Sequence, residues 1–228
     1  MSDRPTRPDP RRELARIVRA LRRSYRESDA PVKLMPASGP FRVLVATVLS
    51  TRTRDPVTAA ATDRLLAVAP DAAALTRLSP DRVERLIYPV GFYRTKARLL
   101  PGLARELVRR GGVPDRLEEL LELPGVGRKV ANIVLNRVWG ADAIAVDTHV
   151  HRLSNRMGLV RTRAPEATER RLMAVLPRRY WRDWNELLVA HGQTVCLPTR
   201  PRCGDCPVSR WCRRAGVSGP ARPASARR

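Results

Sequence analysis

The sequence predicts an all-α fold. Its apolar residues recur at helical spacing, its segments are rich in Ala, Leu and Arg, and the β-branched alternation typical of strands is nearly absent. The 228 residues allow one large domain or two small ones, with enough material for a sizeable core.

Helices are expected in order along the chain. Asp55 fits an N-cap before Pro56 at the first helical position, and Pro101 is expected to kink a longer helix. The run 43–49 (VLVATVL) is apolar enough to be buried on all sides. The expected helices span 12–25, 40–49, 56–66, 71–78, 81–87, 91–110, 116–121, 130–139, 164–176 and 179–189, and a further one begins at Asp147.

The composition favours a polyanionic partner. The formal net charge is +22 and the pI about 11.5, which indicates nucleic acid unless the charge only reflects a general preference for Arg on solvated faces. No stretch reaches the roughly 18 apolar residues of a membrane span, and the N-terminus lacks the apolar core of a signal peptide. We therefore expect a cytoplasmic chain with no membrane partner and with reduced cysteines.

The centre of the chain has the pattern helix, glycine hairpin, helix. The motif LPGVGRK (123–129) stands between the helix-like segment 116–121 and the apolar-periodic segment 130–139. Gly125 and Gly127 permit a turn too tight for side chains, and outward N–H groups at the start of the next helix favour a bound phosphate. An ordinary turn between two helices, with glycine as a helix stop, is the alternative at this point.

Lysine is scarce in this chain. Of the 44 basic residues, only Lys33, Lys96 and Lys129 are lysine. Arginine stays protonated, whereas a helix start and the neighbouring Arg128 are expected to lower the pKa of Lys129, which could then act as a neutral amine nucleophile. The alternative is that Lys129 only binds phosphate.

Asp147 precedes an expected helix and fits an N-cap. Its carboxylate would be ionised and fixed in position at pH 7, and near Lys129 it could stabilise a positive charge developing on a sugar. His149 and His151 would lie on different faces of that helix, so we do not expect a paired metal site there.

Two aromatic residues, Phe92 and Tyr93, open the helix 91–110 beside Arg94 and Lys96. An exposed aromatic side chain here could be an apolar wedge pushed into a base stack, whereas a buried one would belong to the core. The residues alone favour the core, and we expect at least one of the two to lie there.

The cysteines form a separate motif near the C-terminus, Cys196-x6-Cys203-x2-Cys206-x5-Cys212. This spacing predicts a metal site, with disulfides as the alternative that a reducing compartment disfavours. Thiolate sites hold zinc or an iron–sulfur cluster, and a single CxxC favours the cluster. Three arginines lie in the loops that such a site would shape: Arg200, Arg202 and Arg210.

These motifs together carry a resemblance. LPGVGRK-x-AN-x-VLN, then VDTHV (146–150), then the cysteine pattern occur in this order, and residues 11–215 resemble the endonuclease III family of the helix-hairpin-helix DNA glycosylase superfamily. The resemblance implies two lobes: a six-helix barrel over 30–138, with the helix-hairpin-helix at 116–139, and a lobe of 11–29 plus 139–215. The tails 1–10 and 216–228 are expected to be disordered.

The resemblance also implies an activity, that of a monomeric, nucleoid-associated DNA glycosylase and AP lyase of base excision repair. It would bind double-stranded DNA containing a damaged base or an abasic site, remove oxidised pyrimidines and nick the strand. The family's catalytic residues fall on Lys129, which would form a Schiff base with the sugar, and on Asp147. The four cysteines would hold a [4Fe–4S] cluster, and the further DNA contacts would be Gly125, Gly127, Arg128, Arg200 and Arg202.

Two positions depart from the commonest bacterial pattern of that family. Arg52, in LSTRTRD (49–55), replaces a Gln that fills the gap left by the flipped base, and Phe92 replaces the Leu of a GLY wedge. This raises the wedge interpretation of Phe92 above the core one, and Arg52 could donate bidentately to a guanine. Lesion and opposite-base preference therefore stay open. A monofunctional mismatch glycosylase and a non-catalytic, metal-stabilised DNA-binding module remain as alternatives.

Overall fold

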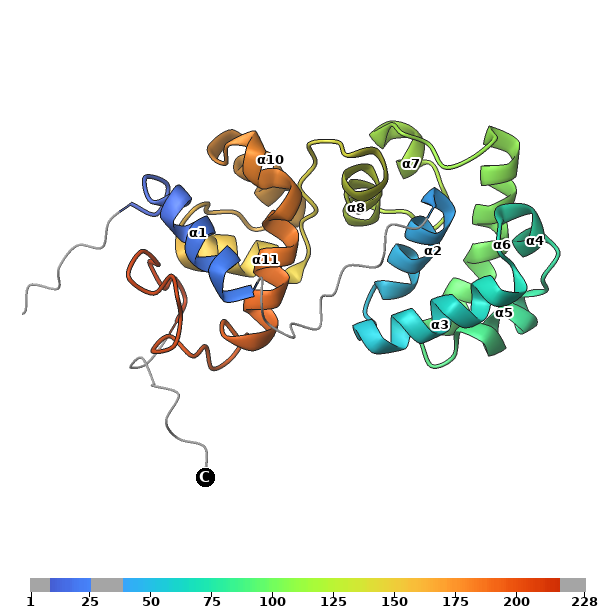
Figure 1. Cartoon of the computed structure of the whole chain (residues 1–228), viewed down its shortest axis with the longest axis horizontal. Coiled ribbons are helices and arrows are strands. Elements are labelled where there is room, and N and C mark those ends of the chain that lie inside the picture. Colours follow the sequence, from blue (N-terminus) through green and yellow to red (C-terminus); the bar gives the residue numbers. More distant parts are fainter. Residues whose placement is uncertain (1–8, 26–38, 218–228) are drawn as a thin grey trace, which may run out of the picture. The chain divides into compact units, whose positions relative to one another are not determined.

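The computed structural model describes residues 9–25 and 39–217, and all regular elements in these two ranges are helices (Figure 1). The all-α prediction is therefore confirmed. The expected tails fall outside the described residues except at 9–10 and 216–217. The chain divides into two compact units: unit 1 comprises residues 1–33 and 146–228, and unit 2 comprises residues 34–145.

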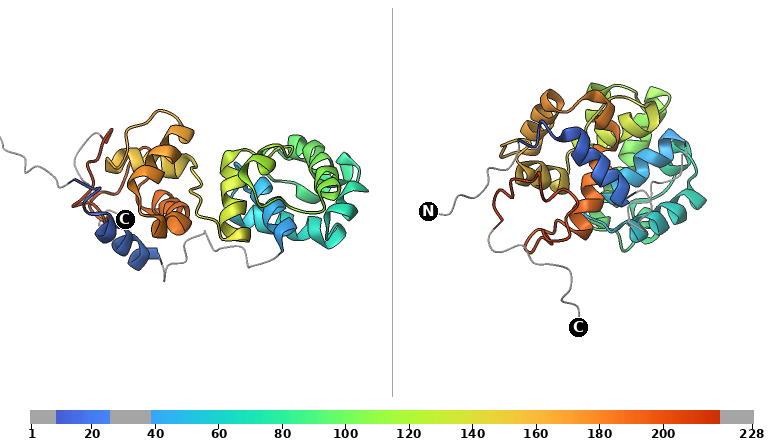
Figure 2. Two further views of the ribbon diagram at one scale, coloured as in Figure 1. Left: turned by 90° about the horizontal axis from the view of Figure 1, so that it is seen from above. Right: turned by 60° about the vertical axis from the view of Figure 1, so that its left-hand side comes forward.

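Unit 2 is built around helix α2. This helix packs against α3, α6 and α8, while α6 also packs against α4 and α5 (Figure 2). All residues from Val43 to Leu49 of α2 are buried, as the apolar run predicts. The helices of unit 2 are α2 (Pro40–Ser50), α3 (Asp55–Val68), α4 (Ala72–Thr76), α5 (Pro80–Ile87), α6 (Tyr93–Arg110), α7 (Leu117–Leu121) and α8 (Arg128–Trp139).

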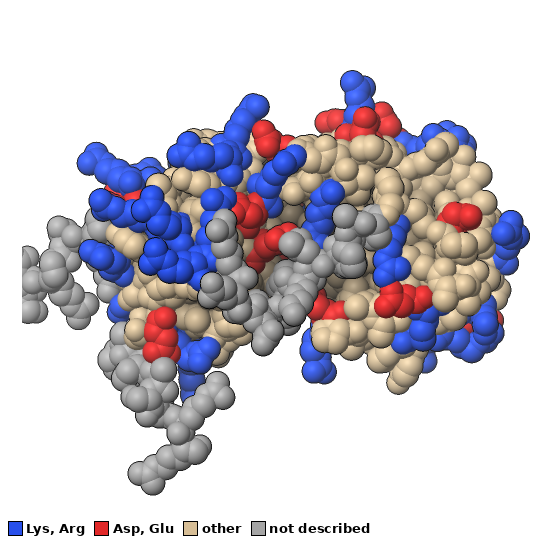
Figure 3. Space-filling view, in the orientation of Figure 1, with Lys and Arg blue, Asp and Glu red and all other residues tan. Residues whose placement is uncertain are grey.

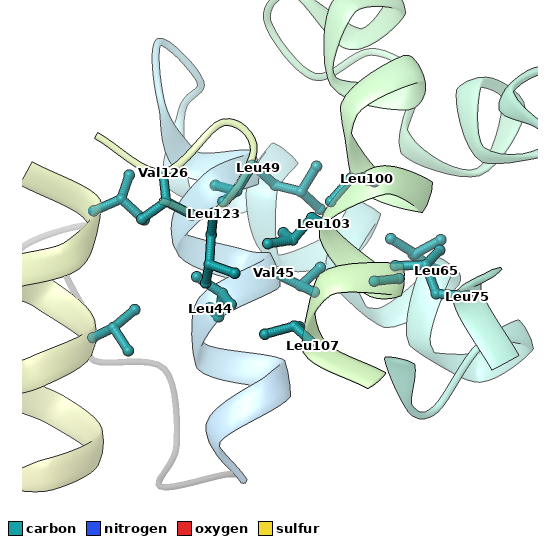
Figure 4. Close-up of a cluster of buried hydrophobic side chains, with 14 of the residues drawn as sticks. Leu44, Val45, Leu49, Leu65, Leu75, Leu100, Leu103, Leu107, Leu123 and Val126 are labelled. Carbon is teal, nitrogen blue, oxygen red and sulfur yellow. The ribbon is translucent and has the colours of Figure 1, made fainter. Parts of the chain in front are cut away.

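A continuous apolar core holds these helices together. Leu100 and Leu103 of α6 are at most 1% exposed, and they lie near Leu44 and Leu49 of α2 (Figure 4). Burying one such side chain contributes roughly 1.5–3 kcal/mol. The core therefore fixes α2 and α6, the helices whose ends carry the loops described below.

Unit 1 is smaller in helical content. Helix α11 packs against α1 and α9, and α9 packs against α10. The fully buried Trp184 of α11 is its largest core side chain. The elements of unit 1 are α1 (Leu14–Tyr25), α9 (Thr148–Met157), α10 (Pro165–Val175), the 3-10 turn η1 (Arg178–Tyr180) and α11 (Trp181–Thr194). Basic side chains dominate the visible face of this unit (Figure 3).

Helix capping follows the sequence with one exception. Asp71 caps α4 and Ser79 caps α5, each accepting a bond from a backbone N–H in the first turn. The predicted N-cap at Asp55 is wrong: Arg54 is the N-cap of α3, with φ −72° and ψ 144°, and Asp55 is already the first helical residue. Proline is tolerated in the first turn generally, so Pro56 did not fix the cap to the residue before it. Among the described helices, none is long and apolar enough to cross a membrane.

Candidate active site and cysteine site

The hairpin between α7 and α8 is anchored by apolar side chains. Leu123 and Val126 are 2% and 5% exposed and belong to the core of unit 2 (Figure 4). Between them Gly125 has φ +76°, where residues with a Cβ are strained, and a Cβ there would lie 3.3 Å from Cδ1 of Leu99. The tight turn of the hairpin therefore requires glycine at position 125.

Gly127 is the N-cap of α8, and its carbonyl accepts from the N–H of Ala131 at 3.0 Å. The N–H groups of Gly125 and Gly127 have no acceptor among the described residues, and both glycines are exposed. Exposed N–H groups at the positive end of a helix dipole favour an anion. The hairpin therefore has the groups that phosphate binding needs.

The two described lysines have different surroundings. Lys129 lies in the first turn of α8 and is partly exposed. Lys96 is 5% exposed, and its Nζ donates to the carbonyls of Leu49 and Thr51 at 2.8 and 2.6 Å. Burial, followed by the charge of Lys129, lowers the pKa of Lys96 to about 8. Lys129 is therefore the candidate amine in the described part of the chain, and Lys33 lies outside it.

Asp55 lies within the electrostatic reach of Lys129. Burial raises the pKa of the Asp55 carboxyl, and the positive charges of Lys129 and Arg137 oppose that rise. The start of α3 thus brings a partly buried carboxyl to the surroundings of the candidate amine. The sequence pattern indicated only a cap at Asp55, although its position at the end of the 49–55 motif was a signal for a place near the site.

Arg52 and Phe92 are brought together by the α2–α3 and α5–α6 loops. Both have left-handed backbones, with φ 54° and 58°, and the Arg52 guanidinium carbon lies 5.4 Å from the centroid of the Phe92 ring. Phe92 is 60% exposed, whereas Tyr93 packs against the core of unit 2. The expectation that one of the two aromatics lies in the core is confirmed for Tyr93.

Asp147 caps α9 in unit 1. Its Oδ1 accepts from the N–H of Val150 at 2.8 Å, as predicted for an N-cap, and the residue is partly exposed. Two histidines follow it in separate surroundings. His149 Nδ1 lies 3.3 Å from the Arg152 guanidinium, and His151 Nδ1 lies 2.6 Å from Thr168 Oγ1.

All four cysteines line one cavity in unit 1, and none of them forms a disulfide within the described residues. Nitrogen atoms lie within hydrogen-bond distance of three of the four sulfurs, those of Cys196, Cys206 and Cys212, and Cys212 Sγ itself donates to the Arg156 carbonyl at 3.6 Å. Arg156 Nη1 donates to Cys196 Sγ at 3.3 Å, His191 Nε2 lies 3.5 Å from Cys206 Sγ, and the Arg214 N–H donates to Cys212 Sγ at 3.4 Å. The N–H donors of Arg156 and Arg214 stabilise sulfur that carries negative charge.

The cavity also suits a positively charged group bound by thiolates. Burial, with the neighbouring thiols adding to it, raises the pKa of Cys206 to about 12, so a cation is needed to hold the Cys206 sulfur as a thiolate. The Nε atoms of Arg202 and Arg214, which line the same cavity, are buried without an acceptor in the described residues. Within those residues, no three His, Cys, Asp or Glu side chains converge as ligands of one ion.

Arg200 and Arg202 of the cysteine segment differ in exposure and in their contacts. Arg200 is exposed, whereas Arg202 is partly buried and its guanidinium donates to the Thr194 carbonyl. The Arg202 N–H also donates to the Val195 carbonyl at 2.9 Å. Arg202 therefore braces the segment against the end of α11, a role that sequence spacing alone does not indicate.

Comparison with known proteins places this chain among DNA repair proteins. Residues 45–178 match the family described as HhH-GPD superfamily base excision DNA repair protein. Endonuclease III of Thermotoga maritima is 45% identical over 203 residues, covering 88% of this chain and 91% of that protein. The fold matches a trapped endonuclease III–DNA covalent intermediate with a TM-score of 0.81, 32% identity, and coverage of 90% of this chain and 96% of that one. A thermostable thymine-DNA glycosylase shares the fold with a TM-score of 0.77 and 23% identity, over 90% of this chain and 95% of that one.

Proposed function

Because this chain belongs to the endonuclease III family of HhH-GPD base excision repair proteins, we propose that it is a DNA glycosylase and AP lyase with Lys129 as its nucleophile. The observation that carries the proposal is the position of Lys129, partly exposed in the first turn after the glycine hairpin. Lys96, in contrast, is buried in α6 and donates hydrogen bonds to two backbone carbonyls. The substrate is double-stranded DNA with an oxidised pyrimidine or an abasic site. The protein acts as a nucleoid-associated monomer.

In the proposed reaction, the damaged nucleotide leaves the base stack and its sugar meets Lys129. The Nζ of Lys129 attacks C1′ as a neutral amine, a C–N bond forms, and the bond from C1′ to the base breaks. Opening of the sugar gives a Schiff base. Loss of a C2′ proton and departure of the 3′ phosphate then cut the strand.

Asp147 is assigned to stabilise the positive charge that develops on the sugar. Its hydrogen bond to the Val150 N–H holds the carboxylate in one orientation, as that role needs. The exposed N–H groups of Gly125 and Gly127 would bind a DNA phosphate, and the Arg128 guanidinium would add positive charge beside it.

Arg52 and Phe92 are assigned to the opposite strand. Their exposed and stacked side chains suit a wedge that enters the duplex as the nucleotide leaves it. A guanidinium can donate two bonds to guanine, so we expect a bias towards guanine opposite the lesion. Relative rates against four opposite bases, measured for the wild type and Arg52→Gln, test this; unchanged ratios would remove the role.

Cys196, Cys203, Cys206 and Cys212 are proposed to hold a [4Fe–4S] cluster, which when bound would fix the segment that presents Arg200 to DNA and that Arg202 holds against the end of α11. The buried guanidinium donors and the four cysteines that line one cavity without a disulfide fit such a group. Zinc is the alternative ligand of this donor set, but it is colourless, whereas an iron–sulfur protein is brown and absorbs at about 400 nm. An absorption spectrum of the purified protein separates the two.

Borohydride trapping on a duplex containing an oxidised pyrimidine tests the whole proposal. The wild type should form a covalent adduct, and Lys129→Gln should not. Lys129→Arg is the matched control, because it keeps the positive charge but cannot form an imine. Base release without an adduct would indicate a monofunctional glycosylase, and binding without either product a non-catalytic DNA-binding module.

A further inference from the structure

The buried Lys96 joins two loops of unit 2. It lies in the first turn of α6, directly after the α5–α6 loop, and its Nζ donates to the carbonyls of Leu49 and Thr51 at the end of α2. Carbonyls at a helix C-terminus carry partial negative charge and favour a cation. One side chain thus fixes the end of α2 to the start of α6.

A second contact joins the same two loops. The N–H of Gly91 donates to Thr53 Oγ1 at 3.0 Å. A Cβ on Gly91 would collide with the carbonyl oxygen of Arg52, so the backbones approach closely enough to require glycine here. Arg52 and Phe92 lie within one residue of these contacts.

The two joined loops are strained at the residues that they expose. Left-handed backbones are unfavourable for residues with a Cβ, so those at Arg52 and Phe92 persist only where the surroundings hold them. The contacts of Lys96 and Thr53 are the surroundings that hold them here. Without these contacts, both residues would relax and their side chains would separate.

We propose that Lys96 is a positioning residue for duplex DNA: by holding the Leu49 and Thr51 carbonyls, it keeps Arg52 stacked on Phe92 in the geometry that enters the opposite strand. This inference rests on the proposed function. It gives a second of the chain's three lysines a task in the reaction that involves no contact with the substrate.

Abasic DNA in two forms separates this role from catalysis. A single strand has no opposite nucleotide for Arg52 and Phe92 to contact, whereas a duplex has one. We expect Lys96→Met to lower kcat/KM on the duplex on the order of tenfold, mainly through KM. This is the effect of losing one charge-assisted hydrogen bond, the one that a displaced Arg52 would no longer donate to the opposite strand. Cleavage of the single strand should stay at the wild-type rate.

Two further variants complete the test. Arg105→Met removes an exposed charge from the same helix and should leave the duplex-to-single-strand ratio unchanged. Thr53→Val keeps Lys96 but loses two hydrogen bonds between neutral groups: the one that Thr53 Oγ1 accepts from the Gly91 N–H, and the one that it donates to the Thr51 carbonyl at 3.2 Å. It should lower the ratio in the same direction by a smaller factor. It also tests the proposal if Lys96→Met fails to fold.

An unchanged ratio in both Lys96→Met and Thr53→Val would overturn the positioning role. So would an equal loss on both substrates, because that would show a general loss of structure. A wild type that cuts neither substrate would instead contradict the proposed function. The two failures are therefore distinguishable.

Discussion

The core of unit 2 and the cysteine segment of unit 1 (residues 195–217) are stabilised in different ways. The core is a continuous apolar cluster that spans all the helices of unit 2. The cysteine segment has no helix, and only Val208 and Cys212 in it are buried. Polar contacts hold it instead, such as those of Arg156 to the carbonyls of Leu197 and Pro198. The proposed nucleophile thus lies in the unit whose apolar core is described above, while the segment proposed to bind the cluster would depend on that ligand for its stability.

Removing a thiol should give the largest effect. Cys203→Ser is expected to abolish absorbance at about 400 nm and to lower the free energy of unfolding of unit 1 by several kcal/mol, because binding of the proposed cluster would be coupled to folding. Hydrogen exchange should show loss of protection in 195–217 but not in α2, α6 or α8. The control is Asp205→Asn, which changes an exposed neighbour. Full protection of residues 195–217 in Cys203→Ser would show that this segment does not need a bound cluster to fold.

Opening a cavity in the core should have the next largest effect, in the other unit. Leu100 is 0% exposed, and Leu100→Ala is expected to lower the free energy of unfolding of unit 2 by about 2–5 kcal/mol. Urea unfolding followed by circular dichroism measures it. Val108→Ala, on the exposed side of the same helix, should change it by less than about 0.5 kcal/mol. Absorbance from the cysteine site should persist in both variants.

Alanine substitutions at two glycines of unit 2 should change the folding stability in opposite directions. Gly125→Ala places a Cβ on a residue with φ +76° and should cost about 1–2 kcal/mol of folding stability. Gly102→Ala lies inside α6, where the nearest atom to a new Cβ is 3.9 Å away, and should stabilise by up to about 1 kcal/mol. Thermal unfolding compares the two; a destabilised Gly102→Ala would show that α6 is packed more tightly than described.

The last effect concerns Lys96, the buried lysine in the described residues, and is seen only as a dependence of stability on pH. Its pKa falls from 10.5 to about 8 on folding, chiefly through burial. Between these pH values the unfolded chain binds the proton and the folded chain does not, so stability rises with pH, by at most about 1.4 kcal/mol per unit. Lys96→Met should lack this rise, whereas Arg105→Met should keep it. Urea unfolding at pH 7.5, 8.5 and 9.5 gives the difference, within roughly that window.

Local patterns predicted the helices but not the contacts between them. The spacing of apolar residues predicted α1, α2 and α8 to within two residues. Periodicity works there because each helix buries one face or is buried throughout. The N-cap of α3 was predicted one residue too late. A proline is tolerated at more than one position in the first turn of a helix, so Pro56 alone does not tell whether Arg54 or Asp55 is the N-cap.

At the candidate sites, too, the sequence predicted local motifs but not the contacts between distant residues. Spacing singled out Lys129 and the four cysteines as candidates, because each motif is contiguous or nearly so. The lysine–carbonyl bonds of Lys96 join residues 45 and 47 positions apart, and His191 reaches Cys206 from a different element. Left-handed backbones at Arg52 and Phe92 have no marker in residue type, since both side chains normally avoid that region. Such features depend on tertiary packing.

The burial of Lys96 has a consequence for side reactions. An abasic sugar is an aldehyde, and it condenses with whatever amine it meets, whereas guanidinium groups do not form imines under the same conditions. One of the three lysines is buried in the core, and arginine supplies almost all other positive charge. The protein can therefore bind the DNA phosphates with many cations while exposing few amines that could react with the abasic sugar. A chain so poor in reactive amines would form few dead-end crosslinks to its own product.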